Sequence, residues 1–272
     1  MASDTDRLMA KRMSAAAGGT RRVPVRAVTL SALLVQILLW CQSLEPANRD
    51  LDSVELFGGD MAITRGMFDL GCKSVSFDKK YYPGDKEDFL TRAGFTRALA
   101  LTLRIKPGGS LWGAPVCSSW GWIGRSTTKR NAHMPWGDLF NPSVKRSNRM
   151  VVLLVMLFLL SVSRGVFVWL EQPASTVMKF FTPMKEFLET YMYQQQVWLK
   201  SYGSKTMKPL SIWSSSEAVH GLKRYKPRPG VRLSVPARCG GTTGIAKELK
   251  DSSAYPAAFG KAVAMLMKTI AR

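Results

Sequence analysis

Short apolar stretches of strand length alternate with longer stretches of helical character between residues 54 and 213. Such alternation is typical of βαβ units, in which parallel strands are joined by helices that cover both faces of the sheet. The expected fold class is therefore α/β, with a doubly wound and mostly parallel sheet. Ligands of such sheets bind at the carboxyl ends of the strands, so the residues that follow each strand are the first candidates for a site.

The hydrophobic pattern sets the expected order of the elements. The expected strands are Val54–Phe57, Ser74–Phe77, Ser110–Ala114, Val166–Leu170, Val197–Leu199 and Ser211–Trp213. The expected helices are Asp60–Leu70, Lys86–Arg104, Lys145–Ser163, Met184–Tyr193 and Ala257–Ala271. The polar, basic stretch Arg125–Asn141 contains Gly and Pro and is expected to be a long loop.

The chain is expected to have one domain with an extension before it. Residues 1–26 are predicted to be a flexible basic arm, and residues 27–50 to contain an apolar helix that is either a targeting segment or packed on the domain. Residues 51–272 then form the domain, with a basic insertion around residues 214–253. The apolar runs Ala27–Trp40 and Met150–Leu160 are both shorter than the roughly 20 residues that span a bilayer, so membrane association is not expected.

The charge of the chain favours a polyanionic partner. A formal net charge of +20 over 272 residues attracts nucleic acid first, although a basic tail, a targeting peptide or a ribonucleoprotein scaffold would give the same excess. The four cysteines are widely spaced and only two histidines are present, so neither a metal site nor a disulfide framework is expected. Reduced thiols indicate an intracellular protein, of the nucleus or of an organelle.

The ends of the first two expected strands suggest a nucleoside cofactor. Gly58 and Gly59 follow the first strand, where glycine lets a ligand approach the backbone and the start of the next helix. Asp78 ends the second strand, where a carboxylate can accept hydrogen bonds from both hydroxyls of a ribose. The loop lacks the Gly-x-Gly-x-x-Gly pattern, which disfavours a dinucleotide.

The ends of the next two strands carry reactive side chains. Cys117 follows the third strand, and basic side chains or a helix N-terminus beside it would lower its pKa and make it a nucleophile. The alternative is an inert structural cysteine. Glu171 follows the buried fourth strand, where it would hold a base or a cofactor amine or act as a proton donor. The alternative for Glu171 is a helix cap.

Basic residues interleaved with aromatic ones are expected to bind nucleic acid, with a solvated basic loop as the alternative. The candidates are Arg125, Lys129, Arg130, Lys205, Lys208, Lys223, Arg224, Lys226 and Arg228. The first three come directly after the Cys117 segment and would place positive charge at the mouth of the site.

Taken in order, these segments resemble the motifs of the cytosine-C5 DNA methyltransferases, and also a group of short methyltransferase-like proteins of unicellular eukaryotes. The segments are Glu55-Leu56-Phe57-Gly58-Gly59, Asp78, Pro115-Val116-Cys117, Glu171-Gln172-Pro173, Tyr202-Gly203-Ser204-Lys205 and Phe259-Gly260-Lys261-Ala262-Val263-Ala264. The resemblance implies a Rossmann-like class I methyltransferase fold and S-adenosylmethionine as cofactor. The cofactor-binding residues that it implies are Glu55, Phe57, Gly58, Gly59, Asp78 and Gly260.

The resemblance also implies a mechanism, in which Cys117 adds to C6 of a flipped-out pyrimidine and Glu171 contacts N3 of the same base. Several positions depart from the family pattern. Val116 separates the proline from the cysteine, Thr206–Lys208 replace an arginine pair, and Lys261 replaces an asparagine. The region before Phe259 is too short for a typical target-recognition domain. Two functions therefore stay open: a methyltransferase acting on DNA or RNA, and a non-catalytic nucleic-acid-binding or structural subunit of a larger assembly.

Overall fold

A computed structural model describes residues 48–82, 84–121, 124–222 and 254–271 of the chain. The predictions for residues 1–26, for nearly all of residues 27–50 and for most of the basic insertion lie outside these ranges. The described residues belong to one compact unit that begins at Glu45. They form an α/β structure around a six-stranded mixed sheet, which confirms the expected α/β class and is compatible with a Rossmann-like fold.

The sheet has the spatial order β2-β1-β3-β4-β6-β5. Its strands are β1 (Leu51–Leu56), β2 (Ser74–Phe77), β3 (Ile105–Gly113), β4 (Phe167–Pro173), β5 (Tyr193–Trp198) and β6 (Pro209–Ser214). Strands β2, β1, β3 and β4 pair in parallel, whereas β6 pairs antiparallel with both β4 and β5. Five strands therefore run in one direction, and β6 alone is reversed.

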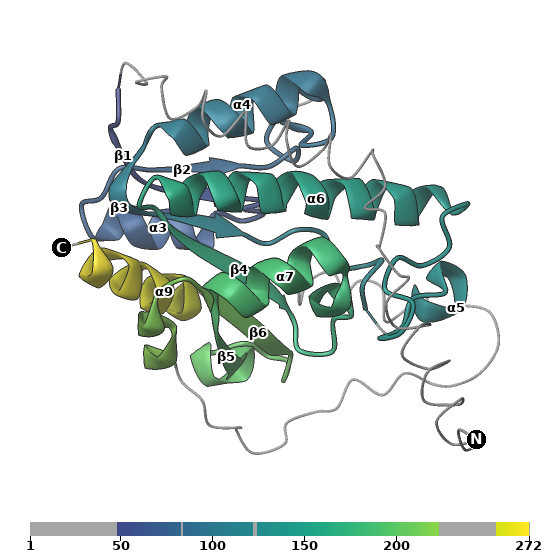
Figure 1. Cartoon of the computed structure of the whole chain (residues 1–272). Helices are drawn as coiled ribbons and strands as arrows, with labels where there is room; N and C mark the ends of the chain where they lie inside the picture. The colour runs from purple at the N-terminus through teal and green to yellow at the C-terminus, as the bar shows by residue number, and fades with distance from the viewer. Residues whose placement is uncertain (1–47, 83, 122–123, 223–253, 272) are drawn as a thin grey trace, which may run out of the picture. The chain divides into compact units, whose positions relative to one another are not determined.

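Helices cover both faces of the sheet (Figure 1). The α-helices are α3 (Ala62–Asp69), α4 (Arg92–Leu103), α5 (Arg125–Thr128), α6 (Pro142–Ser163), α7 (Thr182–Tyr191) and α9 (Ala257–Ile270). Short 3-10 turns are η1 (Asp85–Glu87), η3 (Met178–Phe180), η4 (Leu199–Tyr202) and η5 (Glu217–Gly221).

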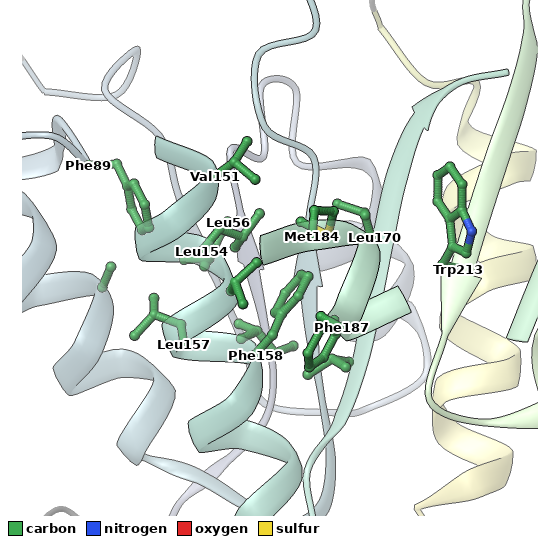
Figure 2. Packing of buried hydrophobic residues seen from close by; sticks show 14 of the residues in the cluster. Leu56, Phe89, Val151, Leu154, Leu157, Phe158, Leu170, Met184, Phe187 and Trp213 are labelled. Carbon is green, nitrogen blue, oxygen red and sulfur yellow. The ribbon is translucent and has the colours of Figure 1, made fainter. Parts of the chain in front are cut away.

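Successive side chains of a strand point to opposite faces of the sheet, so the strands contribute to two separate cores. On one face, Leu111 packs in a cluster with α4, α6 and α7, and Figure 2 shows Leu56 and Leu170 of the sheet gathered with Leu154 and Phe158 of α6. On the other face, Trp112 packs in a cluster with α3 and α9. Both faces of the sheet are thus buried, as in a doubly wound arrangement.

Helix α6 is the longest described helix and covers the centre of the sheet. Asn141 caps it, because its side chain accepts a hydrogen bond from the Ser143 amide at 2.9 Å, and Pro142 occupies the first turn. By length and composition it is the one helix among the described residues that could cross a membrane. Its side chains Val151, Leu154 and Phe158 are completely buried in the core, as expected for the apolar run Met150–Leu160.

Two of the boundaries that differ from the expected ones have local reasons. The predicted helix Lys86–Arg104 is interrupted by a turn, in which the carbonyl of Asp88 accepts from the Thr91 amide; the Thr91 side chain then accepts from the Gly94 amide and caps α4, which begins at Arg92. Strand β3 starts at Ile105 rather than Ser110, so Gly108 and Gly109 lie within the strand. There the Gly108 amide donates to the carbonyl of Gly165 at 2.7 Å.

Helices α3 and α9 touch at their glycines. A Cβ atom on Gly260 would lie 2.2 Å from the carbonyl oxygen of Ala62, and one on Gly66 would lie 2.9 Å from the carbonyl oxygen of Gly260. Gly260 was predicted to contact a cofactor, and this prediction is corrected: its missing side chain makes room for another helix. Glycine is required here by the close approach of two backbones.

Replacing Gly260 with alanine is expected to destabilise the fold. A helical Gly→Ala change normally stabilises by about 1 kcal/mol, but here the added methyl meets backbone atoms, and overpacking of this kind costs about 1–3 kcal/mol. Urea unfolding of Gly260→Ala should therefore show a lower midpoint than that of the wild type. The exposed neighbour Lys261→Ala is the control; an equal or higher midpoint for Gly260→Ala would contradict the close contact.

Candidate functional site

A cavity of about 470 Å³ opens at the carboxyl ends of β1, β2, β3 and β4. Seven of the residues predicted from the sequence line it: Phe57, Gly58, Gly59, Asp78, Cys117, Glu171 and Lys208. The expected cofactor loop and the expected reactive residues therefore share one cavity. That position is where doubly wound sheets bind their ligands.

The loop after β1 has an unusual backbone. Phe57, Gly59 and Met61 all have positive φ values, of 61°, 55° and 58°. The Phe57 amide donates to the carbonyl of Phe77 at 2.7 Å, which ties the loop to the end of β2. Left-handed non-glycine residues are uncommon and are held in place by their surroundings, so the loop is shaped before any ligand arrives.

The two glycines of this loop have different roles. A Cβ atom on Gly58 would lie 1.9 Å from Ser76 Oγ, so that position is closed by the protein itself. A Cβ atom on Gly59 would meet nothing within 4 Å, so that position is open. Both glycines line the cavity, but only Gly59 has open space where a side chain would stand.

Asp78 holds the loop from the end of β2. Its Oδ2 accepts from the Gly59 amide at 3.0 Å and its Oδ1 accepts from the Lys80 amide at 2.8 Å. An ionised carboxylate has about four acceptor positions, so both oxygens retain capacity for further donors such as ribose hydroxyls.

An aromatic wall stands beside the loop. Phe57 and Phe89 both line the cavity, and their rings meet edge to face with centroids 4.9 Å apart. Phe89 also packs on Phe77 and Phe95, which fixes its position. Such a wall offers a flat apolar surface to a heterocyclic ring.

Glu55 was predicted to bind the cofactor, and the structure places it elsewhere. Its side chain points to the opposite face of β1 from Leu56 and is buried. One oxygen accepts from the amide and hydroxyl of Thr64 at 2.8 and 2.6 Å, and the other from the Ile63 amide at 3.4 Å. Although burial raises the pKa of Glu55, these donors favour its charged form. Glu55 therefore anchors the first turn of α3 and does not line the cavity.

Cys117 lies in a turn that follows β3. Its carbonyl accepts from the amides of Trp120 and Gly121 at 2.9 and 3.0 Å. Gln172 of β4 is completely buried, and its Nε2 donates to the carbonyl of Pro115 at 2.7 Å. Gln172 therefore holds the Cys117 segment against the neighbouring strand.

The expected lowering of the Cys117 pKa is wrong. Burial and then the charge of Glu171 raise the pKa of this thiol, and the more weakly acting Lys208 does not reverse the shift. The thiol is therefore kept protonated at neutral pH in the protein alone.

Glu171 borders the cavity from β4 and is 6% exposed. Tyr255 lines the same cavity, and Glu171 Oε1 is buried with no hydrogen-bond partner among the described residues. Burial raises the pKa of Glu171, and Lys208 and Tyr255 oppose this shift. An unpartnered buried oxygen beside a cavity is costly, so it marks an atom that a ligand can satisfy.

Lys208 reaches this cavity because β6 is reversed. The residue precedes β6, and the amino end of an antiparallel strand lies at the same edge of the sheet as the carboxyl ends of its neighbours. Lys208 thus places a cation near both Cys117 and Glu171. It stands in the segment where the family pattern has an arginine pair.

Replacing Glu171 with glutamine is expected to speed the alkylation of Cys117. The amide keeps the shape of the side chain but removes the charge that raises the pKa of the thiol. The pKa of Cys117 then falls and more thiolate is present at any given pH. The pH profile of iodoacetamide labelling, read by mass spectrometry on the Cys117 peptide, should move to lower pH. Cys72 serves as the internal reference, and an unmoved profile would mean that Glu171 carries no charge opposite the thiol.

Arg130 was predicted to bind nucleic acid, and this prediction is wrong because the side chain is 1% exposed. Its guanidinium carbon lies 3.5 Å from the ring centroid of Trp120. It donates to Ser119 Oγ at 3.1 Å, to Asn148 Oδ1 at 2.8 Å and to the carbonyl of Pro135. Burial lowers its pKa to about 10, which still leaves it charged at neutral pH. Arg130 therefore fastens the segment after Cys117 to α6.

Arg130→Met is expected to unfold more easily than the wild type. The substitution keeps an apolar stem on Trp120 but leaves Asn148 Oδ1 and the Pro135 carbonyl without their charged donor, which costs about 1.5–3 kcal/mol. Chemical unfolding followed by tryptophan fluorescence measures the difference. The matched control is the exposed Arg125→Met. Equal destabilisation by the two changes would show that Arg130 is not a structural residue.

The other basic candidates divide into three groups. Arg125 and Lys129 are exposed on the segment next to the Cys117 turn, and Lys205 is exposed in the connection between β5 and β6. Lys208 lines the cavity. Lys223, Arg224, Lys226 and Arg228 lie outside the described residues.

Apolar side chains gather in the segment that leads to α6. Phe140 is 92% exposed, and Met134, Trp136 and Leu139 are each exposed by about half. Between residues 124 and 149, five exposed cations accompany them: Arg125, Lys129, Lys145, Arg146 and Arg149. Asp138 is the one acidic residue of that stretch. We call residues 124–149 the basic rim.

Sequence reasoning missed several residues of the cavity, among them Tyr255, Phe89 and Arg146. Tyr255 precedes α9 and enters the site only because that helix docks on α3. Phe89 and Arg146 line the cavity from the turn before α4 and from α6. Phe89 belonged to an apparent helical pattern and Arg146 to an ordinary helix N-terminus, so neither carried a local signal.

Comparison with known proteins leaves the site to be interpreted from its own geometry. No family model and no curated protein matches the chain. Within the described residues, no group of three or more His, Cys, Asp or Glu side chains is arranged to hold a metal ion.

Proposed function

We propose that this chain is an S-adenosylmethionine-dependent methyltransferase of the Rossmann-like class that acts on nucleic acid, with C5 of a cytosine as the methyl acceptor. The observation that carries the proposal is the shared cavity. The glycine loop with Asp78 occupies one side of it, and Cys117 with Glu171 occupies the other. A nucleoside cofactor and a planar base could therefore meet within one space of about 470 Å³.

The residues on the first side fit a nucleoside with a charged tail. Gly59 is open to the cavity, Asp78 has spare acceptor positions for ribose hydroxyls, and Phe57 and Phe89 present ring surfaces. When bound, the cofactor would supply an electrophilic methyl group. Asp78 would orient the ribose, and the preformed loop would hold the cofactor without rearranging.

The residues on the second side fit a pyrimidine. Cys117 would add to C6 of the base as a thiolate and shift the C5=C6 electron pair to C5, which would then bond the methyl group; loss of the C5 proton to water would restore the double bond and release the thiolate. Protonated Glu171 would donate to N3 through its unpartnered Oε1. Lys208 would favour the thiolate once a base has displaced water from the cavity, because its charge acts on Cys117 in the required direction. Gln172 would hold the Cys117 segment while the bond forms.

The basic rim supports a polynucleotide as the substrate. Its exposed cations can track phosphates, and Phe140 and Trp136 can stack on unpaired bases. Arg130 binds this rim to the Cys117 turn, so a strand lying on the rim would be close to the reactive thiol.

One observation favours a second candidate, a non-catalytic nucleic-acid-binding subunit that retains the fold. The pKa of Cys117 is raised rather than lowered in the protein alone. A thiol in such a site becomes a nucleophile only when a bound ligand, or a segment that closes over the cavity, lowers its pKa. If no such shift occurs, the cavity would bind without reacting.

Two measurements test the proposal. Calorimetry with S-adenosylmethionine should give saturable binding to the wild type and weaker binding to Asp78→Ala, which loses both the ribose acceptor and the bond to Gly59. Asp69→Ala, on the exposed end of α3, is the control and should bind like the wild type. Absence of binding at millimolar cofactor would reject the methyltransferase proposal.

Transfer of labelled methyl groups from the cofactor to single-stranded and duplex DNA and RNA then tests catalysis. Cys117→Ser should abolish transfer while leaving cofactor binding intact, because the serine hydroxyl is a much poorer nucleophile. Cofactor binding without transfer to any of these substrates would favour the non-catalytic candidate. Equal transfer by both forms would rule out the covalent step.

A further inference from the structure

We propose that the basic rim binds single-stranded nucleic acid in preference to a duplex, with Phe140 as the side chain that stacks on an unpaired base. The inference rests on the proposed function in taking nucleic acid as the partner, and it deepens that function by naming the form of the strand. Binding to the rim requires neither the cofactor nor the reaction, so it can be measured by itself.

Phe140 is presented by a turn that is built before any ligand arrives. Its side chain is 92% exposed, yet its amide donates to Asp138 Oδ1 at 2.9 Å. The Asp138 amide in turn donates to the carbonyl of Thr128 at 2.8 Å. Asn141 Nδ2 donates to the carbonyl of Thr127 at 3.1 Å, which binds the turn to α5. The backbone that carries Phe140 is therefore already fixed, so less conformational entropy is lost when a ligand covers the ring.

Trp136 offers a second ring on the same rim. It is 44% exposed, and its ring centroid lies 4.5 Å from that of Phe181. Phe181 is completely buried and also packs on Trp120, with centroids 5.3 Å apart. The Trp120 amide donates to the carbonyl of Cys117 at 2.9 Å. Two ring contacts therefore connect the exposed ring of Trp136 to the turn that carries the thiol.

Three cations of the rim lie near the amino end of α6, where positive charge is unfavourable for the helix itself. Lys145, Arg146 and Arg149 stand within its first two turns or directly after them, and the first turn holds no acidic residue. The helix dipole is positive at this end and disfavours cations there, whereas an external phosphate is attracted by both. Arg146 lies 3.8 Å from Asp88 and also lines the cavity, so the rim is continuous with the site.

The mixture of exposed apolar and basic side chains favours a single strand over a duplex. A duplex keeps its bases stacked inside and presents mainly its charged backbone, which offers no partner to Phe140, Leu139 or Met134. A single strand presents phosphates together with the faces of unpaired bases, and each base that stacks on an aromatic ring strengthens binding.

An anionic membrane is the other surface that accepts apolar and basic side chains together. The continuity of the rim with the cavity through Arg146 favours a flexible strand, because a strand can follow the rim and turn a base into the cavity. A lipid surface would use the rim alone.

The test is the binding of one labelled oligonucleotide, as DNA and as RNA, to the full chain without cofactor. Fluorescence anisotropy compares the single strand with the same strand paired to its complement, and the wild type should bind the single strand more tightly. Phe140→Ala should weaken single-strand binding by about 5- to 150-fold, the equivalent of one lost stacking contact, and leave duplex binding unchanged. Phe68→Ala, which removes an exposed ring from α3, is the control and should change neither affinity.

Two further variants separate stacking from simple apolar contact. Phe140→Trp should keep the single-strand affinity, whereas Phe140→Leu, which stays apolar but has no ring, should bind the single strand about as weakly as Phe140→Ala. Equal affinity of the wild type for the two forms, or unchanged single-strand affinity in Phe140→Ala, would overturn the proposal. Binding to vesicles of phosphatidylcholine and phosphatidylserine but not to the oligonucleotide would also overturn it, in favour of a membrane contact.

These outcomes are distinct from those of the methyltransferase assays. Single-strand binding that depends on Phe140, without methyl transfer, would support the rim proposal and reject catalysis. Tighter binding and faster methyl transfer with duplex than with single strands would reject the rim proposal and leave the methyltransferase in place.

Discussion

The contact between α3 and α9 is the constraint on which the cavity depends. Gly66 and Gly260 let the two backbones meet, and this contact closes the second core around Trp112 and Phe259. Helix α3 begins at the glycine loop that borders the cavity, where Glu55 holds its first turn. Helix α9 follows Tyr255. One packing interaction therefore places both the helix that follows the glycine loop and Tyr255 at the cavity, although neither glycine lines the cavity itself.

The charges of the cavity are balanced rather than uniformly basic, despite the large positive charge of the chain. Asp78 and Glu171 border the interior, and Lys208 is the cation that acts on the thiol. The excess of exposed positive charge in the described residues near the site lies on the basic rim. An anionic group that entered the cavity would therefore meet carboxylates, whereas one on the surface would meet the cations of the basic rim.

Much of the scaffold could be predicted from the sequence, since the types of residue at the strand ends make those ends recognisable. Ser74–Phe77 and the start of α9 at Ala257 agree with the expected bounds, and Gly59, Asp78, Cys117 and Glu171 do share one cavity. Prediction failed where burial decides the role of a charged group. Arg130 stands in a basic run and yet lies inside, and Glu55 matches a cofactor motif and yet caps a helix. The spacing of residues in the sequence does not show how deeply a side chain is buried or which distant residue it contacts.

The reversed direction of β6 has a consequence for how such a site can change over time. Ordinary parallel strands reach the cavity only through the segments that follow them, each of which also has to lead into a crossover helix. The connection between β5 and β6, residues 199–208, lies at the same edge but joins two adjacent antiparallel strands. It can lengthen, shorten or exchange its basic residues without moving any helix. This hairpin is therefore the part of the cavity's border that can change in length and charge while the sheet and its helices stay in place.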